Sequence, residues 1–319
     1  YSRVRKMKSF LSKLATNSAN FNLNYSENLL LIKKMRDLET RAKEKSELRR
    51  SRFEERSQLS PRDRLTALLD PGMPFLELFN MAGYLVDDPN PETTIPGSTI
   101  ISGIGYVNST RCLVWIDDSG INAGASTMKS VEKGLSCINL AKKHKLPLIH
   151  LVESAGANLM AYTVELWANA GGLFGGLAEL SALGIPTVTV LHGPSTAGGA
   201  YQPGLSDYVI GIKKNGMAAL AGSALVKAAT GEISSDAELG SAEMHSEVTG
   251  SVEYLAEDDA HGIEIARDVV RMLAWNTSTT VTTGSAKPPK YVAEEILGLV
   301  PTDYRKPYDV KELIARLVD

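Results

Sequence analysis

The pattern of apolar and polar positions divides the chain into a polar beginning and a longer part in which short apolar runs alternate with amphipathic segments. Residues 26–58 are rich in charge and in helix-forming residues, and their apolar side chains recur at helical spacing. We therefore predict one or two exposed amphipathic helices there. Ser60 followed by Pro61 is typical of an N-cap and a first helical position, so a short helix should begin there and end at residues 70–72.

Five apolar, largely β-branched runs follow and predict strands. The runs at 100–107 and 112–116 are expected to form a hairpin, and the others lie at 148–152, 187–191 and 208–212. Helical patterns occupy the intervals between several of these runs. This alternation is typical of a layered α/β domain in which helices cover parallel strands. The predicted helices lie at 126–144 and 173–183.

The end of the chain has a different composition. A stretch rich in Ser, Thr and Gly predicts a linker at 276–285, and a last helical segment begins near Val310. The abrupt stop at Asp319 suggests that a further domain is missing. The expected organisation is a helical arm at 1–59, an α/β domain at 60–275, and a linker with the start of a connection to an absent domain at 276–319.

Composition excludes several classes of function. With 43% hydrophobic and 22% charged residues, the 319-residue chain has the balance of a soluble globular protein. A net charge of -3 gives no strong field for nucleic acid or a membrane surface, and no apolar run reaches the roughly 20 residues of a membrane span. Neither the five histidines nor Cys112 and Cys137 have the spacing of metal ligands, so no metal is expected.

Cysteine usage and the first residues bear on location. Two cysteines suit a reducing compartment, so a cytoplasmic location is expected. The first 26 residues are basic and contain no acid before Glu27, which is also typical of an organellar transit peptide, and the mitochondrial matrix is the alternative. Because the chain begins with Tyr1, Met7 is the expected start residue.

Two turns of small residues carry the candidate chemistry. The first, at 153–157, follows the predicted strand at 148–152, and the second, at 193–201, follows the run at 187–191. Consecutive N–H groups in such turns can form a nest for an anionic oxygen, and neighbouring strand ends meet at one edge of a sheet. We therefore expect one ligand site with the geometry of an oxyanion hole.

Other chemistries fit the same turns poorly. The second turn lacks the lysine of a phosphate loop, the chain has no Gly-x-Gly-x-x-Gly for a dinucleotide, and neither turn provides the Gly-x-Ser-x-Gly of a serine hydrolase. Glu153 and Glu165 are candidate general bases, although acidic side chains near strand ends more often cap helices or face solvent.

The turns and the sequence around them resemble the β-type carboxyltransferase subunits of biotin-dependent acyl-CoA carboxylases, most of all the methylcrotonyl-CoA and geranyl-CoA group. The resemblance covers nearly the whole chain from Ser60. It rests on Ser60-Pro61-Arg62-Asp63-Arg64, Leu69-Asp70-Pro71-Gly72, Ile101-Ser102-Gly103-Ile104-Gly105, Ala197-Gly198-Gly199-Ala200-Tyr201-Gln202-Pro203, Leu225-Val226-Lys227-Ala228-Ala229-Thr230-Gly231-Glu232 and Asp259-Ala260-His261. It implies a crotonase-like fold, a ββα spiral of the α/β class, behind the N-terminal helical arm.

The resemblance also implies a mechanism. A proton leaves the acyl-CoA carbon, the enolate attacks CO2 released from carboxybiotin, and biotin itself receives the proton. The backbone N–H groups of Ala155 and Gly156 would hold the thioester oxygen. Residues implied to bind substrate are Ala123, Gly124, Ser154, Ala157, Thr196, Ala197, Gly198, Gly199, Ala200 and Tyr201.

The sequence departs from the family at three places. The usual Asp-Ser-Gly-Gly-Ala is Glu-Ser-Ala-Gly-Ala at 153–157, so Ala155 adds a Cβ and does not readily adopt positive φ. The usual Lys-Gly-Gly is Asn-Ala-Gly at 122–124, which removes a cation from the CoA region. Residues 159–170 lack the charge pattern of methylcrotonyl-CoA enzymes, which leaves the acyl chain open.

Family members are also longer, because a second crotonase-like domain completes their active sites. The implied partners are acyl-CoA, biotin carried on a biotin carboxylase or carrier subunit, and a carboxyl-terminal carboxyltransferase domain on the same gene product or a separate chain, in a homo- or hetero-oligomer. No nucleic acid or membrane partner is expected. Two alternatives remain: a subunit of a sodium-pumping acyl-CoA decarboxylase, which would copurify with a membrane partner, and a non-catalytic scaffold with the same fold.

Overall fold

The computed structural model describes residues 10–158, 160, 163–275 and 288–318. The chain forms two compact units: unit 1 is Tyr1–Leu38 with Ser278–Asp319, and unit 2 is Glu39–Thr277. Helix α1, Ala19–Glu47, contributes residues to both. The boundary therefore falls inside a helix, which differs from the expected division at residue 59.

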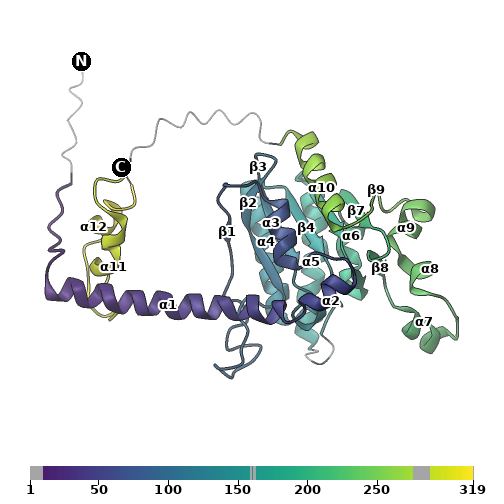
Figure 1. The fold of residues 1–319 in the computed structure, drawn as a ribbon, viewed down its shortest axis with the longest axis horizontal. Coiled ribbons are helices and arrows are strands. Elements are labelled where there is room, and N and C mark those ends of the chain that lie inside the picture. Colours follow the sequence, from purple (N-terminus) through teal and green to yellow (C-terminus); the bar gives the residue numbers. More distant parts are fainter. Residues whose placement is uncertain (1–9, 159, 161–162, 276–287, 319) are drawn as a thin grey trace, which may run out of the picture. The chain divides into compact units, whose positions relative to one another are not determined.

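Unit 2 is built on a seven-stranded sheet with the order β1-β2-β3-β4-β5-β7-β9 (Figure 1). The first three strands are antiparallel, and each later neighbouring pair is parallel. A second sheet consists of β6 and β8. The strands are β1 Leu76–Glu77, β2 Ile100–Val107, β3 Thr110–Asp117, β4 Leu148–Val152, β5 Thr187–Leu191, β6 Pro194–Thr196, β7 Tyr208–Ile212, β8 Met217–Ala219 and β9 Tyr254–Ala256.

Helices in unit 2 connect and cover these strands. The helices are α2 Arg50–Glu55, α3 Pro61–Leu68, α4 Met128–His144, α5 Val164–Ala182, α6 Tyr201–Gly204, α7 Ser223–Thr230, α8 Asp236–Gly240, α9 Ala242–Met244 and α10 Asp259–Leu273. Short 3-10 turns lie at η1 Asn122–Gly124 and η3 Ala197–Gly199, and a π-helical turn lies at η4 His245–Thr249.

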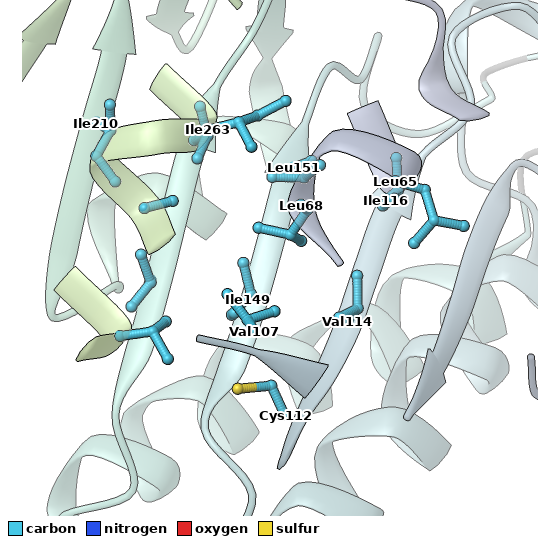
Figure 2. Close-up of a cluster of buried hydrophobic side chains, with 14 of the residues drawn as sticks. Leu65, Leu68, Val107, Cys112, Val114, Ile116, Ile149, Leu151, Ile210 and Ile263 are labelled. Carbon is cyan, nitrogen blue, oxygen red and sulfur yellow. The ribbon is translucent and has the colours of Figure 1, made fainter. Parts of the chain in front are cut away.

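The sheet carries an apolar core on each face because successive strand residues point to opposite sides. In β3, Cys112, Val114 and Ile116 belong to a cluster with residues of α3 and α10, whereas Leu113 and Trp115 belong to a cluster with residues of α4 and α5. Figure 2 shows the first cluster, in which side chains from the two helices lie over the strands. The strands are thus buried between two helical layers.

Most of the predicted elements are confirmed. The hairpin joins β2 to β3, and the strands predicted at 148–152, 187–191 and 208–212 end at the expected residues. Ser60 caps α3, with its hydroxyl oxygen accepting the Asp63 N–H. Helix α5 begins at Val164 rather than 173, because Thr163 caps it and accepts the Leu166 N–H. Helix α10 was not predicted, although it packs on four strands, β2, β5, β7 and β9.

Unit 1 combines the first part of α1 with the segment from residue 288. Its other elements are η5 Ala293–Glu295, α11 Ile296–Leu299 and α12 Val310–Ile314. The side chain of Asn24 donates to the Gly298 carbonyl oxygen at 3.1 Å, and Arg316, only 1% exposed, binds Glu295 and Glu312. The described part of the C-terminal segment is therefore packed on α1. The predicted linker at 276–285 lies outside the described residues.

Candidate functional site

The first turn and the second turn lie against each other at one edge of the sheet. The first turn, residues 153–157, leaves β4, and the second turn, residues 193–201, leaves β5; the two strands are parallel neighbours. The Ser154 N–H donates to the Pro194 carbonyl oxygen, and the Thr196 N–H donates to the Ser154 carbonyl oxygen, each at 3.1 Å. The prediction that the two turns come together is confirmed.

A third loop, residues 122–124, follows β3 and joins the first turn. The Ala155 N–H donates to the Ala123 carbonyl oxygen at 3.1 Å, and the Ser154 hydroxyl donates to the Gly124 carbonyl oxygen at 2.9 Å. The side chain of Ser154 is thus committed to holding two loops together. Loops from three consecutive strands of the sheet form the site.

Glycine is required where these loops meet. Gly156 has φ +78°, and a Cβ there would lie 2.8 Å from the Thr196 carbonyl oxygen, well inside van der Waals contact. A Cβ on Gly199 would lie 3.1 Å from the Ser154 carbonyl oxygen, and one on Gly124, at φ +69°, would collide with the Glu153 carbonyl oxygen. Each glycine thus permits a close backbone approach.

Three non-glycine residues of these loops adopt the left-handed conformation. They are Asn122 at φ 49°, Ala123 at φ 53° and Ala197 at φ 51°. Such positions cost of order 1–3 kcal/mol each and persist only where packing enforces them. Ala155 is not among the described residues with positive φ, and it is exposed, so its Cβ is accommodated. The strain that the sequence suggested for position 155 instead falls on Ala123.

The two N–H groups of the first turn that were expected to hold the thioester oxygen already have partners. The Ala155 N–H binds Ala123, and the Gly156 N–H donates to the Ser154 Oγ at 3.2 Å. The sequence-based assignment of both as free oxyanion donors therefore differs from the structure, because the loops pack closely enough to bond one another. In the second turn, Gly198 and Gly199 lie in the first turn of a 3-10 helix, where N–H groups lack intrahelical acceptors at the helix start.

Buried ionic groups lie beneath both turns. Arg64, which is 0% exposed, donates from Nη1 to Glu153 Oε2 at 2.8 Å and from Nε to Asp259 Oδ2 at 3.0 Å. Asp259 Oδ1 lies 2.8 Å from Nδ1 of His192. Glu153 is therefore an ion-pair partner and not a free base. We call Arg64, Glu153, His192 and Asp259 the buried network.

The pKa values of this network follow from burial and charge. Burial by itself raises the pKa of Asp259, but His192 and Arg64 outweigh it through charge and hydrogen bonds and lower that pKa to about 2. Burial and the positive charge of Arg64 lower the pKa of His192. The imidazole is therefore neutral at pH 7, and its Nδ1–H donates to Asp259.

Two cavities flank the turns. One of about 570 Å³ is mainly apolar and is lined by Ala200 and Tyr201 of the second turn together with Val209 and Leu239. Another of about 680 Å³ is lined by Asn122 and neighbours, including Glu165. Glu165 is exposed at the start of α5 and belongs to this second cavity. Both volumes lie within the range of ligand pockets.

Sequence reasoning placed the turns but missed the buried network. Arg64 and Asp259 were noted only as parts of the family motifs, and His192 only as one of five histidines without metal-ligand spacing. A buried arginine between two carboxylates leaves no local sequence pattern to detect, since Arg64 and Glu153 are 89 residues apart.

Within the described ranges, no group of His, Cys, Asp and Glu could hold a metal ion, and no helix is long and apolar enough to span a membrane. Residues 159, 161 and 162 of the expected specificity segment lie outside the described residues.

The sequence and the fold match known proteins. The family profile described as "Carboxyl transferase domain" matches residues 53–319. The chain is 41% identical over 268 residues to "Probable biotin-dependent acyl-coenzyme A carboxylase beta2 subunit" of Mycobacterium tuberculosis, covering 84% of this chain and 49% of that protein. It is 38% identical over 273 residues to "Methylcrotonoyl-CoA carboxylase beta chain, mitochondrial" of Arabidopsis thaliana, covering 83% and 46%.

A solved structure shows the same fold. The beta subunit of geranyl-CoA carboxylase from P. aeruginosa superposes with a TM-score of 0.88 at 45% identity, over 97% of this chain and 57% of that chain. The crotonase-like α/β fold expected from the sequence is thereby confirmed. The chain spans about half the length of the curated relatives it matches.

Proposed function

The chain belongs to the carboxyl transferase family, and we propose that it binds an acyl-CoA thioester and stabilises its enolate in the carboxyltransferase half-reaction of a biotin-dependent acyl-CoA carboxylase. The observation that carries the proposal is the meeting of the first and second turns at one edge of the sheet, beside an apolar cavity of about 570 Å³. Open α/β sheets place ligands at this edge. Backbone N–H groups there can meet the oxygen on which charge develops.

The second turn is the better source of those N–H groups. For Ala155 to serve, the Ala123 carbonyl would have to give up its hydrogen bond, and for Gly156 to serve, the Ser154 hydroxyl would have to move. The start of η3 needs no such change at Gly198. We therefore assign the thioester oxygen to the N–H groups at Gly198 and Gly199, with the first turn as their support.

The side chains at the turns fit a reaction in which the protein supplies no base. Glu153 is bound to Arg64, and His192 is bound to Asp259 beneath the surface. A carboxylated biotin on a partner protein would supply the CO2 and accept the proton. The residues of this chain would hold the acyl group, orient its carbonyl and stabilise the enolate oxygen.

Partner surfaces are expected because active sites of this family are completed by a second domain. Helix α7 has no buried residue, and apolar side chains around it are exposed: Leu220, Leu225, Ile233 and Val248 are 61–84% exposed. Exposed apolar side chains that gather in one region mark an interaction site, and we infer that the region around α7 is one. We propose that a carboxyl-terminal carboxyltransferase domain covers it within an oligomer that also recruits biotin carboxylase and carrier subunits.

The compartment is a proposal of the same kind. Cys112 and Cys137 are buried free thiols, which fits a reducing compartment. The Arabidopsis relative is named as mitochondrial. Cytoplasm and mitochondrial matrix both satisfy the thiol chemistry, and imaging of the tagged full-length protein would separate them.

Calorimetric titration of the folded chain with acetyl-CoA, 3-methylcrotonyl-CoA and a longer acyl-CoA tests thioester binding, with free CoA as the comparison. A matched pair of variants tests the site. A Cβ on Gly198 would make an ordinary 3.7 Å contact with Phe174, whereas one on Gly199 would press on Ser154 at 3.1–3.3 Å. Gly199→Ala should weaken thioester binding about 10-fold or more, and Gly198→Ala should change it less than about 3-fold.

Two results would contradict the proposal. The first is the absence of binding for every thioester by folded wild-type chain. The second is equal binding by the Gly199→Ala variant and the wild type, because the second turn would then not contact the ligand. Circular dichroism on each variant excludes a simple loss of fold.

A further inference from the structure

We infer that Arg64 is the positioning residue that sets the separation of the first and second turns, and so the geometry of the thioester site. The inference rests on the proposed function for the identity of the ligand. The contacts of Arg64 that support the inference do not depend on the proposed function. The side chain lies in α3, which contributes no residue to either turn, and it is fully buried.

One guanidinium group connects the beginnings of both turns. Towards the first turn, Nη1 of Arg64 binds Glu153 directly at 2.8 Å. Towards the second turn, Nε binds Asp259 at 3.0 Å, and Asp259 binds His192, the residue before Gly193. Arg64 therefore fixes the residue at which each turn leaves its strand.

Residues that precede α3 strengthen the connection between Arg64 and the second turn. The Gln58 Nε2 donates to the His192 carbonyl oxygen at 2.7 Å, and the Leu59 N–H donates to Asp259 Oδ2 at 2.9 Å. Gln58 is buried. The main chain of His192 is thus held by Gln58, and the Asp259 carboxylate that holds its imidazole is itself bound by Arg64 and Leu59.

Glu153 also touches the second turn directly. A Cβ on Gly193 would lie 2.6 Å from the Glu153 Cδ, so the carboxylate is packed against the backbone of Gly193. A shift of Glu153 must therefore move the second turn as well as the first. Arg64 holds that carboxylate in place, which makes the spacing of the turns depend on one side chain.

The chemistry of the guanidinium suits this role. Its planar fork presents separate N–H donors at fixed angles, so it can satisfy Glu153 and Asp259 together. A lysine ammonium has the same charge, but its flexible stem and point charge fix no such angle. Replacement of Arg64 by lysine therefore keeps the positive charge but no longer fixes the angle between Glu153 and Asp259. A change in the Arg64→Lys variant thus reports the loss of positioning and not the loss of charge.

Unit 1 provides a matched control. Arg316 is 1% exposed and is also shared by two carboxylates, with Nη1 at 2.8 Å from Glu312 and Nη2 at 2.7 Å from Glu295. Arg64→Lys and Arg316→Lys thus make the same chemical change at two buried arginines, although Glu295 is 28% exposed whereas both partners of Arg64 are buried. Of the two arginines, only Arg64 binds a residue that begins a turn, Glu153, and it reaches His192 through Asp259.

The experiment measures acyl-CoA affinity by calorimetry, backbone hydrogen exchange by peptide mass spectrometry, and thermal unfolding for both variants. For Arg64→Lys we expect affinity to fall about 10-fold or more, as misplaced binding groups commonly cause, and exchange to rise in peptides covering residues 153–158 and 193–201. Exchange in β4 and β5 should be unchanged. For Arg316→Lys we expect affinity within about 2-fold of the wild type.

If the Arg64→Lys variant does not fold, the Glu153→Gln and Asp259→Asn variants test the same contacts of Arg64 from the side of its partners. Glu153→Gln should release mainly the first turn, and Asp259→Asn mainly the second, each seen as faster exchange in that turn. Arg64 is a positioning residue only if the turns respond while the sheet does not. Unchanged exchange in both turns in all folded variants, or equal affinity losses for Arg64→Lys and Arg316→Lys, would overturn the inference. If the wild type binds no thioester, the proposed function fails, whereas the exchange pattern still decides whether Arg64 positions the turns.

Discussion

The first and second turns are built from the same small residues, yet they use their backbones differently. In the first turn, the N–H groups of Ser154, Ala155 and Gly156 all donate within the protein. The second turn runs into a short helix, whose first N–H groups have no intrahelical acceptors. Because each backbone N–H supplies one donor, we propose that the first turn, whose donors are used within the protein, supports the site and that the second turn binds the ligand. Composition alone does not distinguish them.

The largest expected effect comes from breaking the supporting turn. Gly156→Ala places a Cβ 2.8 Å from the Thr196 carbonyl oxygen at φ +78°, so it should destabilise the protein by about 2–4 kcal/mol through strain and overpacking. Urea unfolding followed by circular dichroism measures this loss.

Its neighbour provides the control for this change. Ala155→Gly exchanges the same two residue types in the opposite direction at an exposed position, and it should cost no more than about 1 kcal/mol by backbone entropy. Equal stability of the Gly156→Ala variant and the wild type would show that the first turn is not tightly held.

A smaller effect comes from the buried network beneath both turns. Folding lowers the pKa of Asp259 from 3.8 to about 2, so its carboxylate stabilises the protein above pH 4, and about 2 kcal/mol is lost as the pH falls towards 2. His192 acts in the same direction at higher pH. Its folded pKa lies below 6.5, so the unfolded chain takes up the proton first and stability declines below pH 6.5.

The pH dependence of the free energy of unfolding tests this assignment. Asp259→Asn should flatten the decline between pH 4 and pH 2. Asp268→Asn, which removes an exposed ion-pair partner of Arg271 from the same helix, should leave the decline unchanged. Indistinguishable profiles for the Asp259→Asn variant and the wild type would remove Asp259 from the network that supports the turns.

The smallest expected effect is that of a substitution at Ala123 in the third loop. Ala123 holds φ 53° and ψ 32°, a left-handed conformation that costs an alanine about 1 kcal/mol relative to glycine. Ala123→Gly should therefore raise the free energy of unfolding by up to about that amount.

Ala125→Gly is the matched change at φ -65°, an ordinary conformation, and it should instead lower stability by about 0.5–1 kcal/mol. Thermal unfolding of both variants resolves the difference in sign. If both variants lose stability, the backbone at Ala123 is not strained.

Local sequence was sufficient for the five central strands of the sheet, β2, β3, β4, β5 and β7, and for the position of the candidate site, but not for the edge strands β1 and β9. The strands at 148–152, 187–191 and 208–212 are buried on both faces, so each has a largely apolar or β-branched sequence with turn residues at its end. Two such ends carrying small residues were enough to place a candidate site at one edge. Helix α10 escaped prediction even though Asp258 caps it, because its segment was read only as a family motif.

Only the tertiary structure determines which N–H groups of the candidate site are free and which of its side chains are paired. Whether the Ala155 N–H is free depends on the Ala123 carbonyl, which reaches it from a different strand end. Whether Glu153 is a base depends on Arg64, a residue 89 positions earlier that only the packing of α3 on the sheet brings within 2.8 Å. A sequence lists the donors, acceptors and charges of a protein. Hydrogen bonds and ion pairs form only between groups that the fold brings together, so the partner of each group, and with it the role of each residue, is fixed only in the folded chain.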